Sequence, residues 1–218
     1  MRRWFGLTVA AQLTVGCVEG SNPSGTVRDR NEAVLSTAGP SSTTAPGGTS
    51  SAPPTKPPRA LCSSRPRAKT PDTHIDTAAA PGAYAPPTPI PFGSGRWIWV
   101  NLWAAWCGPC KEELPRLLKW QKVLRKIGIS LEFAFVSMDD DERQMARFLV
   151  SQPPDGVRST YWLKEGDRAK WLGPFGISEA ATLPVHALVS PKGEVACVIE
   201  GALEESDFPQ LRAVFQGG

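Results

Sequence analysis

Apolar and polar positions follow regular periods only in the C-terminal part of the chain. Residues 96–103 are aromatic, β-branched and almost continuously apolar, which predicts a central strand covered on both faces. Residues 112–127 carry apolar side chains at helical spacing, and Gly128 is expected to end that helix. The further elements predicted are a strand at 131–137, a helix capped within Asp139–Asp141, a strand at 159–163, a helix at 167–172, strands at 185–189 and 194–199, and a helix at 204–215. This alternation predicts a three-layer α/β fold, with a sheet between helices.

The first 17 residues have the pattern of an export signal. Arg2 and Arg3 precede an apolar run to Gly16, which is typical of a secretory signal peptide and shorter than the roughly 20 residues of a membrane-spanning helix. Residues 13–17, Leu-Thr-Val-Gly-Cys, resemble a bacterial lipobox, in which Cys17 would become the lipid-modified first residue. We therefore expect an exported, extracytoplasmic protein, lipid-anchored to a bacterial membrane on the periplasmic side. The alternative is an ordinary cleaved signal with an incidental cysteine.

Residues 18–89 are rich in Pro, Ser, Thr and Gly, and 14 of the 22 prolines precede Trp97. Such a segment has too few large apolar residues to offset the entropy of ordering it. We therefore expect a disordered linker at 18–89 and a single folded domain at 90–218. Cys62 lies in this linker with no partner at any motif spacing, so we interpret it as incidental, or as a thiol that pairs between molecules.

The net charge of +3 belongs to the N-terminal segments and not to the domain. Residues 96–218 contain 15 Lys and Arg against 16 Asp and Glu, so the domain is close to neutral. A nucleic-acid partner would require a basic face on the folded part. The composition indicates none, and we expect no nucleic-acid binding.

The most specific chemical signal is a pair of cysteines. Cys107 and Cys110 stand two residues apart, at the junction between the first predicted strand and its helix. A disulfide can close there within the first helical turn, where the helix dipole and free amides favour a thiolate, and Pro109 suits an early helical position. Zinc binding is the alternative, but a structural zinc site needs four ligands. The remaining cysteines form no second pair and the histidines are His74 and His186, so the pattern favours redox chemistry without a metal.

The segment 101–115, Asn-Leu-Trp-Ala-Ala-Trp-Cys-Gly-Pro-Cys-Lys-Glu-Glu-Leu-Pro, strongly resembles the active-site segment of the thioredoxin superfamily. It is most similar to the TlpA/ResA-like branch, which consists of exported, membrane-associated disulfide reductases, and the resemblance extends over residues 97–215. It implies a three-layer thioredoxin-like fold with a central mixed β-sheet flanked by helices, and no cofactor. It also implies that Cys107 is the exposed nucleophile and that Cys110 resolves the mixed disulfide.

The resemblance assigns supporting roles to several neighbours of this pair. Asn101 stands where thioredoxins carry a buried Asp, and an Asn side chain cannot accept a proton. Glu113 matches a glutamate that tunes the thiols in this branch, although it is also a first-turn acid favoured by the helix dipole. Pro184 matches the cis-proline of the loop that contacts the dithiol and an extended substrate. The other matched positions are Trp103, Trp106, Gly108, Pro109 and the helix-kinking Pro115.

Two further residues have ordinary structural interpretations. His186 lies in a predicted buried strand, so we interpret it as a satisfied core histidine, with a part in proton transfer as the alternative. Cys197 alternates within an apolar strand and is interpreted as a buried, inert packing residue.

We therefore expect a thiol–disulfide oxidoreductase, specifically a membrane-tethered reductase of protein disulfides. It would act as a monomer on protein thiols and disulfides, and a membrane or extracytoplasmic electron donor would recharge it. Two alternatives stay open: a disulfide-donating oxidase, and a non-catalytic binding module in which the Cys107–Cys110 bridge is static.

Overall fold

The computed structural model describes residues 59–62, 70–71 and 74–217. The predicted signal segment, Cys17 and most of the predicted linker therefore lie outside the described residues. Among the helices that the structure does describe, none is long and apolar enough to cross a bilayer.

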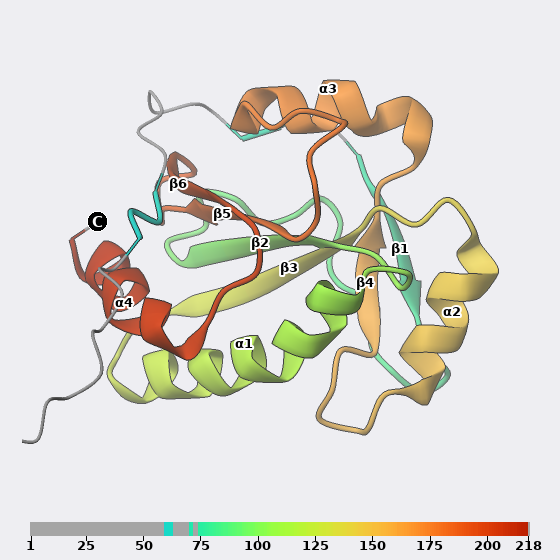
Figure 1. Ribbon diagram of the computed structural model, residues 1–218, viewed down its shortest axis with the longest axis horizontal. Helices are drawn as coiled ribbons and strands as arrows, with labels where there is room; N and C mark the ends of the chain where they lie inside the picture. Colours follow the sequence, from blue (N-terminus) through green and yellow to red (C-terminus); the bar gives the residue numbers. More distant parts are fainter. Residues whose placement is uncertain (1–58, 63–69, 72–73, 218) are drawn as a thin grey trace, which may run out of the picture. The chain divides into compact units, whose positions relative to one another are not determined.

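A six-stranded sheet in the order β1-β4-β3-β2-β5-β6 forms the middle layer (Figure 1). In chain order its strands are β1 Asp76–Ala79, β2 Trp97–Trp103, β3 Leu131–Ser137, β4 Ser159–Trp162, β5 Val185–Val189 and β6 Val195–Glu200. The central strand β2 pairs in parallel with β3 and antiparallel with β5. β3 also pairs in parallel with β4, whereas β1 and β6 add antiparallel edges. The predicted mixed sheet is confirmed.

Helices cover both faces of this sheet. They are α1 Gly108–Lys126, α2 Glu142–Ser151, α3 Arg168–Leu172 and α4 Phe208–Gln216, with short 3-10 turns at Glu165–Asp167, Gly173–Phe175 and Glu205–Asp207. Figure 1 shows α1 and α4 on one side of the sheet and α3 on the other. This is the three-layer arrangement that the sequence predicts.

The alternating side chains of β2 connect these layers. All seven residues of the strand are buried, as expected of a strand covered on both faces. Ile98 and Leu102 pack in one cluster with Trp171 of α3. Trp99 points to the opposite face, where it packs in a second cluster with Trp120 of α1. The strand therefore fixes the position of both helical layers relative to the sheet.

Helix α1 begins at the cysteine pair. Cys107 is its N-cap residue, and the Cys107 Sγ accepts a hydrogen bond of 3.2 Å from the Cys110 amide. Pro109 lies in the first turn, where its missing N–H leaves no bond unmade. After Lys126 the chain passes through Gly128 with φ +88°, a left-handed conformation that glycine adopts readily. The predicted end of this helix is confirmed.

The fold begins before residue 90, so the prediction of a linker through residue 89 is wrong in its C-terminal part. β1 pairs with β4 from Asp76 opposite Trp162 to Ala79 opposite Ser159, and Ile75 is buried in the core. A four-residue edge strand of Asp, Thr and Ala has no apolar period that would distinguish it from a polar linker. Its pairing with β4 decides its structure.

A disulfide joins Cys62 to Cys197 across 135 positions of sequence. The interpretations of Cys62 as incidental and of Cys197 as an inert packing residue are therefore wrong. Leu61 is buried in the same apolar cluster as Cys197, so residues 59–62 belong to the folded domain. No spacing rule could pair two cysteines that only the tertiary fold brings together.

Replacing Cys62 and Cys197 together with alanine should destabilise the domain. The bridge closes a long loop, and losing a native disulfide of this kind costs about 2–5 kcal/mol of unfolding free energy. Urea denaturation of both oxidised proteins, followed by tryptophan fluorescence, measures the difference. An unchanged midpoint and slope would contradict a stabilising role for the bridge.

Candidate active site

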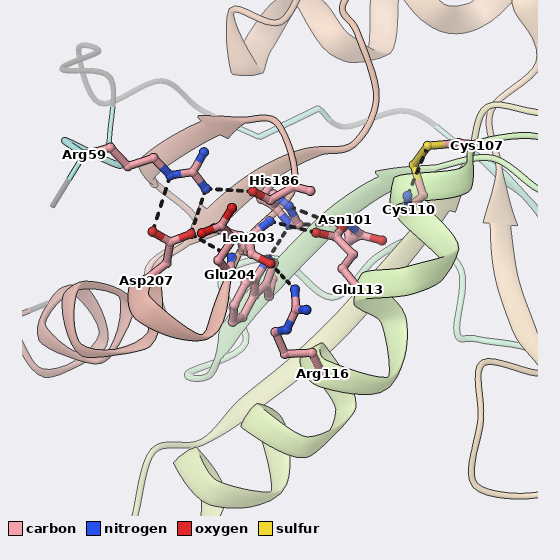
Figure 2. Close-up of polar contacts among 12 residues, drawn as sticks. Arg59, Asn101, Cys107, Cys110, Glu113, Arg116, His186, Leu203, Glu204 and Asp207 are labelled. Atoms are coloured by element: carbon pink, nitrogen blue, oxygen red, sulfur yellow. Dashed lines mark hydrogen bonds and ion pairs between the residues drawn. A yellow bond between two sulfur atoms is a disulfide. The ribbon is translucent and has the colours of Figure 1, made fainter. Parts of the chain in front are cut away.

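The Cys107–Cys110 disulfide lies between the end of β2 and the first turn of α1 (Figure 2). Cys107 is 5% exposed and Cys110 is fully buried, while the neighbouring Trp106 is 56% exposed. Cys107 is therefore the more accessible of the two, but it is itself buried in this disulfide form, so the expectation of an exposed nucleophile is wrong in that respect. It also stands at the helix N-terminus, where free amides favour a negative charge. This geometry suits Cys107 to attack a disulfide, and it suits the buried Cys110 to attack the mixed disulfide that results.

A buried aspartate holds the loop before Cys107. The Ala105 amide donates to both carboxylate oxygens of Asp139, at 3.0 and 2.9 Å, and the Ser137 hydroxyl donates to Oδ2 at 2.7 Å. The Cys107 amide in turn donates to the Ala104 carbonyl. Burial raises the pKa of Asp139, and the hydrogen bonds from Ala105 and Ser137 oppose that rise. Sequence reasoning missed this role, because Asp139 stands in a run of three aspartates that resembled a helix cap.

The helix cap is Asp141, whose Oδ1 accepts from the Arg143 amide. The expected helix cap is therefore Asp141, the last aspartate of the run. Asp139, the first, instead accepts hydrogen bonds from the loop that precedes Cys107.

The two tryptophans flanking the redox motif differ in environment. Trp103 is fully buried, donates from Nε1 to the Thr160 hydroxyl at 3.1 Å and packs against Phe148. Trp106 presents an exposed apolar surface next to Cys107. Trp103 thus packs in the core beside the site, whereas the exposed ring of Trp106 can contact a partner protein.

Three buried polar side chains meet one helical turn beyond the dithiol (Figure 2). Asn101 on β2 stands directly opposite His186 on β5, so their side chains share the sheet face that α1 covers. Glu113 reaches this pair from α1: its Oε1 accepts from Asn101 Nδ2 at 3.0 Å and lies 3.4 Å from His186 Nε2. The other oxygen, Oε2, accepts from the Leu203 amide at 3.0 Å. Glu113 and Cys110 are three residues apart and lie on neighbouring positions of one helix face.

The hydrogen bonds of His186 define its tautomer. Trp99 Nε1 can only donate, and it points at His186 Nδ1 at 3.2 Å, while Asn101 Nδ2 lies 3.3 Å from the same nitrogen. Nδ1 is therefore the acceptor, and the proton is on Nε2, which faces Glu113. The predicted burial of His186 is confirmed, but its interpretation as a satisfied core histidine is wrong, because Nε2 lies 3.4 Å from Glu113 Oε1 and makes no hydrogen bond among the described residues. Asn101 Oδ1 has no hydrogen-bond partner among the described residues.

The Leu183–Pro184 peptide bond is cis, and Pro184 is buried. Leu183 packs against the apolar cluster that contains Cys107 and Cys110. Leu183 thus packs beside the part of the core that contains the dithiol, and Thr182 just before it is exposed. In the part of the chain that the structure describes, no group of three or more His, Cys, Asp or Glu is placed to hold a metal ion.

Comparison with known proteins identifies similar chains. A family model described as thioredoxin-like matches residues 95–195. The chain is 30% identical over 112 residues to the thiol-disulfide oxidoreductase ResA of Bacillus subtilis, covering 51% of this chain and 57% of that protein. It is 26% identical over 109 residues to ResA of Oceanobacillus iheyensis, covering 50% and 52% respectively. The chain thus spans little more than half the length of these curated relatives.

Among solved structures, the chain is similar to a putative thiol:disulfide interchange protein DsbE from Chlorobium tepidum. The TM-score is 0.51 at 17% identity, and the match covers 71% of this chain and 98% of that one. At this identity the similarity concerns the fold, and it confirms the predicted thioredoxin-like architecture.

Replacing Asp139 with asparagine should change how stability depends on pH. Because burial raises the pKa of Asp139, the folded protein binds this proton more tightly than the unfolded chain does. The stability contributed by the proton is complete below the ordinary pKa of 3.8 and is lost as pH rises through the raised value. Since Asn cannot titrate, the unfolding free energy of Asp139→Asn should fall less steeply over this interval than that of the unchanged protein.

Urea denaturation at a series of pH values measures both slopes. Asp155→Asn is the matched control, because Asp155 is exposed and its only described ion pair is with Lys122 at 3.7 Å. The control should keep the original slope. Identical slopes for Asp139→Asn and the unchanged protein would contradict the raised pKa.

Proposed function

We propose that the chain is a TlpA/ResA-like member of the thioredoxin superfamily and a thiol–disulfide oxidoreductase acting on proteins. The observation that carries this proposal is the position of the Cys107–Cys110 pair. It stands at the start of α1, beside the cis-Pro184 loop and the exposed Trp106. An extended segment of a protein substrate could lie across this surface with its disulfide at Cys107.

The proposed reaction transfers two electrons to a substrate disulfide. The Cys107 thiolate attacks one substrate sulfur, so that a mixed disulfide forms and the other substrate sulfur leaves as a thiolate. Cys110 then attacks the Cys107 sulfur, which releases the second substrate thiolate and closes the Cys107–Cys110 bridge. The complete burial of Cys110 beside Cys107, which keeps 5% exposure, supports this division of roles. A membrane or extracytoplasmic donor would return the two electrons.

We assign Glu113 to the proton transfer at Cys110. A fully buried thiol needs a nearby base before it can attack, and Asn101 cannot serve as one. The Glu113 carboxylate lies one helical turn beyond Cys110. Its oxygens accept hydrogen bonds from Asn101 and the Leu203 amide, and the His186 ring lies beside them. Like Cys110, it lies on the buried face of α1.

We further propose that the protein works outside the cytoplasm as a tethered reductase. The N-terminal sequence supports export and lipid attachment at Cys17, and the linker would then connect the anchor to the domain. The Cys62–Cys197 disulfide supports an oxidising compartment, because such bridges persist there and are rare in the cytosol.

Trapping the mixed disulfide tests the exchange reaction. In Cys110→Ser the resolving thiol is absent, so a disulfide-containing peptide should remain covalently attached to Cys107, and mass spectrometry should detect the adduct. Cys107→Ser is the matched control, and it should form no adduct and lose at least about 10³-fold in turnover, since the nucleophile is gone. Equal turnover in Cys107→Ser and the unchanged protein would remove the proposed function. A bridge that never exchanges would leave the static binding module.

The reduction potential of the pair tests the direction of transfer. Equilibration in glutathione or dithiothreitol buffers should give a value near the roughly −270 mV of thioredoxin if the protein is a reductase. A value near the roughly −120 mV of a strong disulfide donor would instead support the oxidase alternative.

A further inference from the structure

Residues 59–62 contact the loop between β6 and α4. The Arg59 guanidinium donates from Nη2 to the Ala202 carbonyl at 2.7 Å. It also forms a bidentate ion pair with Asp207, from Nη2 to Oδ2 at 2.7 Å and from Nε to Oδ1 at 3.3 Å. The Asp207 side chain is only 6% exposed, so this carboxylate is held against the protein and not in solvent.

The same loop contacts the polar cluster from its other side (Figure 2). The Leu203 amide donates to Glu113 Oε2 at 3.0 Å, and the Leu203 carbonyl accepts from Arg116 of α1. The next amide, that of Glu204, donates to Asp207 Oδ2 at 2.8 Å. Two consecutive peptide units are thus fixed between Glu113 on one side and the Arg59–Asp207 pair on the other.

We propose that residues 59–62 form a positioning clamp for the redox centre, in which Arg59 holds the 201–204 loop so that the Leu203 amide stays on Glu113. Leu61 and the Cys62–Cys197 bridge fasten the clamp to the domain, since Leu61 is buried and Cys197 lies in β6. Arg59 is a positioning residue: it touches neither thiol and acts through Asp207, Ala202 and Leu203.

The burial of Glu113 explains why its hydrogen bond from the Leu203 amide matters for thiol–disulfide exchange. Its side chain is 1% exposed, so neither oxygen can replace a lost protein donor with bulk water. Oε1 keeps Asn101 and His186 as neighbours whatever the loop does, but the described donor to Oε2 is the Leu203 amide. Releasing the loop therefore removes the hydrogen bond to Oε2 of Glu113. Under the proposed function, this carboxylate exchanges a proton with Cys110, so the loss alters that exchange.

The test is a double-mutant cycle between Arg59→Ala and Glu113→Gln. The readout is the equilibrium constant of the Cys107–Cys110 pair with glutathione, scored on alkylated peptides so that the Cys62–Cys197 bridge is counted separately. Arg59→Ala should change this constant about threefold to tenfold, the latter being about 30 mV for a two-electron couple. In the Glu113→Gln background the same change at Arg59 should have almost no effect.

Arg96→Ala is the matched control. Arg96 also has a side chain that is 42% exposed and an ion pair, with Glu132, but that pair lies at the far end of β2 from the dithiol. This variant should leave the equilibrium constant unchanged. Equal effects of Arg59→Ala with and without Glu113, or no effect at all, would overturn the proposal.

Hydrogen exchange of the Leu203 amide tests the clamp independently of activity. It should be at least about tenfold faster in Arg59→Ala and unchanged in Arg96→Ala, because only the first variant frees the loop. If the unchanged protein exchanges no disulfides, the proposed function fails, yet the Leu203 amide still reports on the clamp. Unaltered protection of Leu203 in Arg59→Ala would reject the clamp while leaving the proposed function in place.

Discussion

The pairing of β2 with β5 positions most of the redox centre. It sets Asn101 opposite His186 on the face that α1 covers, and the end of the same strand leads directly into Cys107. A shift of one residue in this register would turn Asn101 towards the α3 layer and bring Val100 under the helix. The continuous burial of β2 between two apolar layers makes that shift costly. The polar site therefore depends on an apolar strand.

A carboxylate buried at this point must be satisfied by groups from several elements. Glu113 receives one donor from β2 and one from the 201–204 loop, and the His186 ring faces it from β5. Each of these elements is held by its own packing, so the protein alone fixes the orientation of the Glu113 carboxylate. Asp139 fixes Ala105, two residues before Cys107, in a comparable way. Buried acids thus hold the chain just before the dithiol and, at Glu113, just after it.

The candidate site residues that the sequence predicts are those that can be recognised from their near neighbours in the chain. Cys107, Cys110 and Glu113 follow helical spacing, and Asn101 and Pro184 belong to short motifs, so a resemblance could locate all of them. Arg59 and the Cys62–Cys197 bridge act across more than a hundred residues of sequence. Asp139 gave no signal because its partners are a backbone amide and a serine, and β1 was missed because only pairing with β4 makes it a strand. Contacts created by tertiary structure are invisible to spacing rules.

The two disulfides of this chain differ in a way that separates their roles. The bridge at the helix start joins residues three apart, whereas Cys62–Cys197 spans 135 positions. In the chain-entropy limit the long loop contributes about 5 kcal/mol of stability and the short one about 2 kcal/mol. By linkage, folding favours closure of the long bridge by about that much more than the unfolded chain does, where loop entropy opposes it. Cys62–Cys197 therefore fastens residues 59–62 to the folded domain, whereas the short Cys107–Cys110 bridge contributes less to the fold and suits a pair that opens and closes in the proposed cycle.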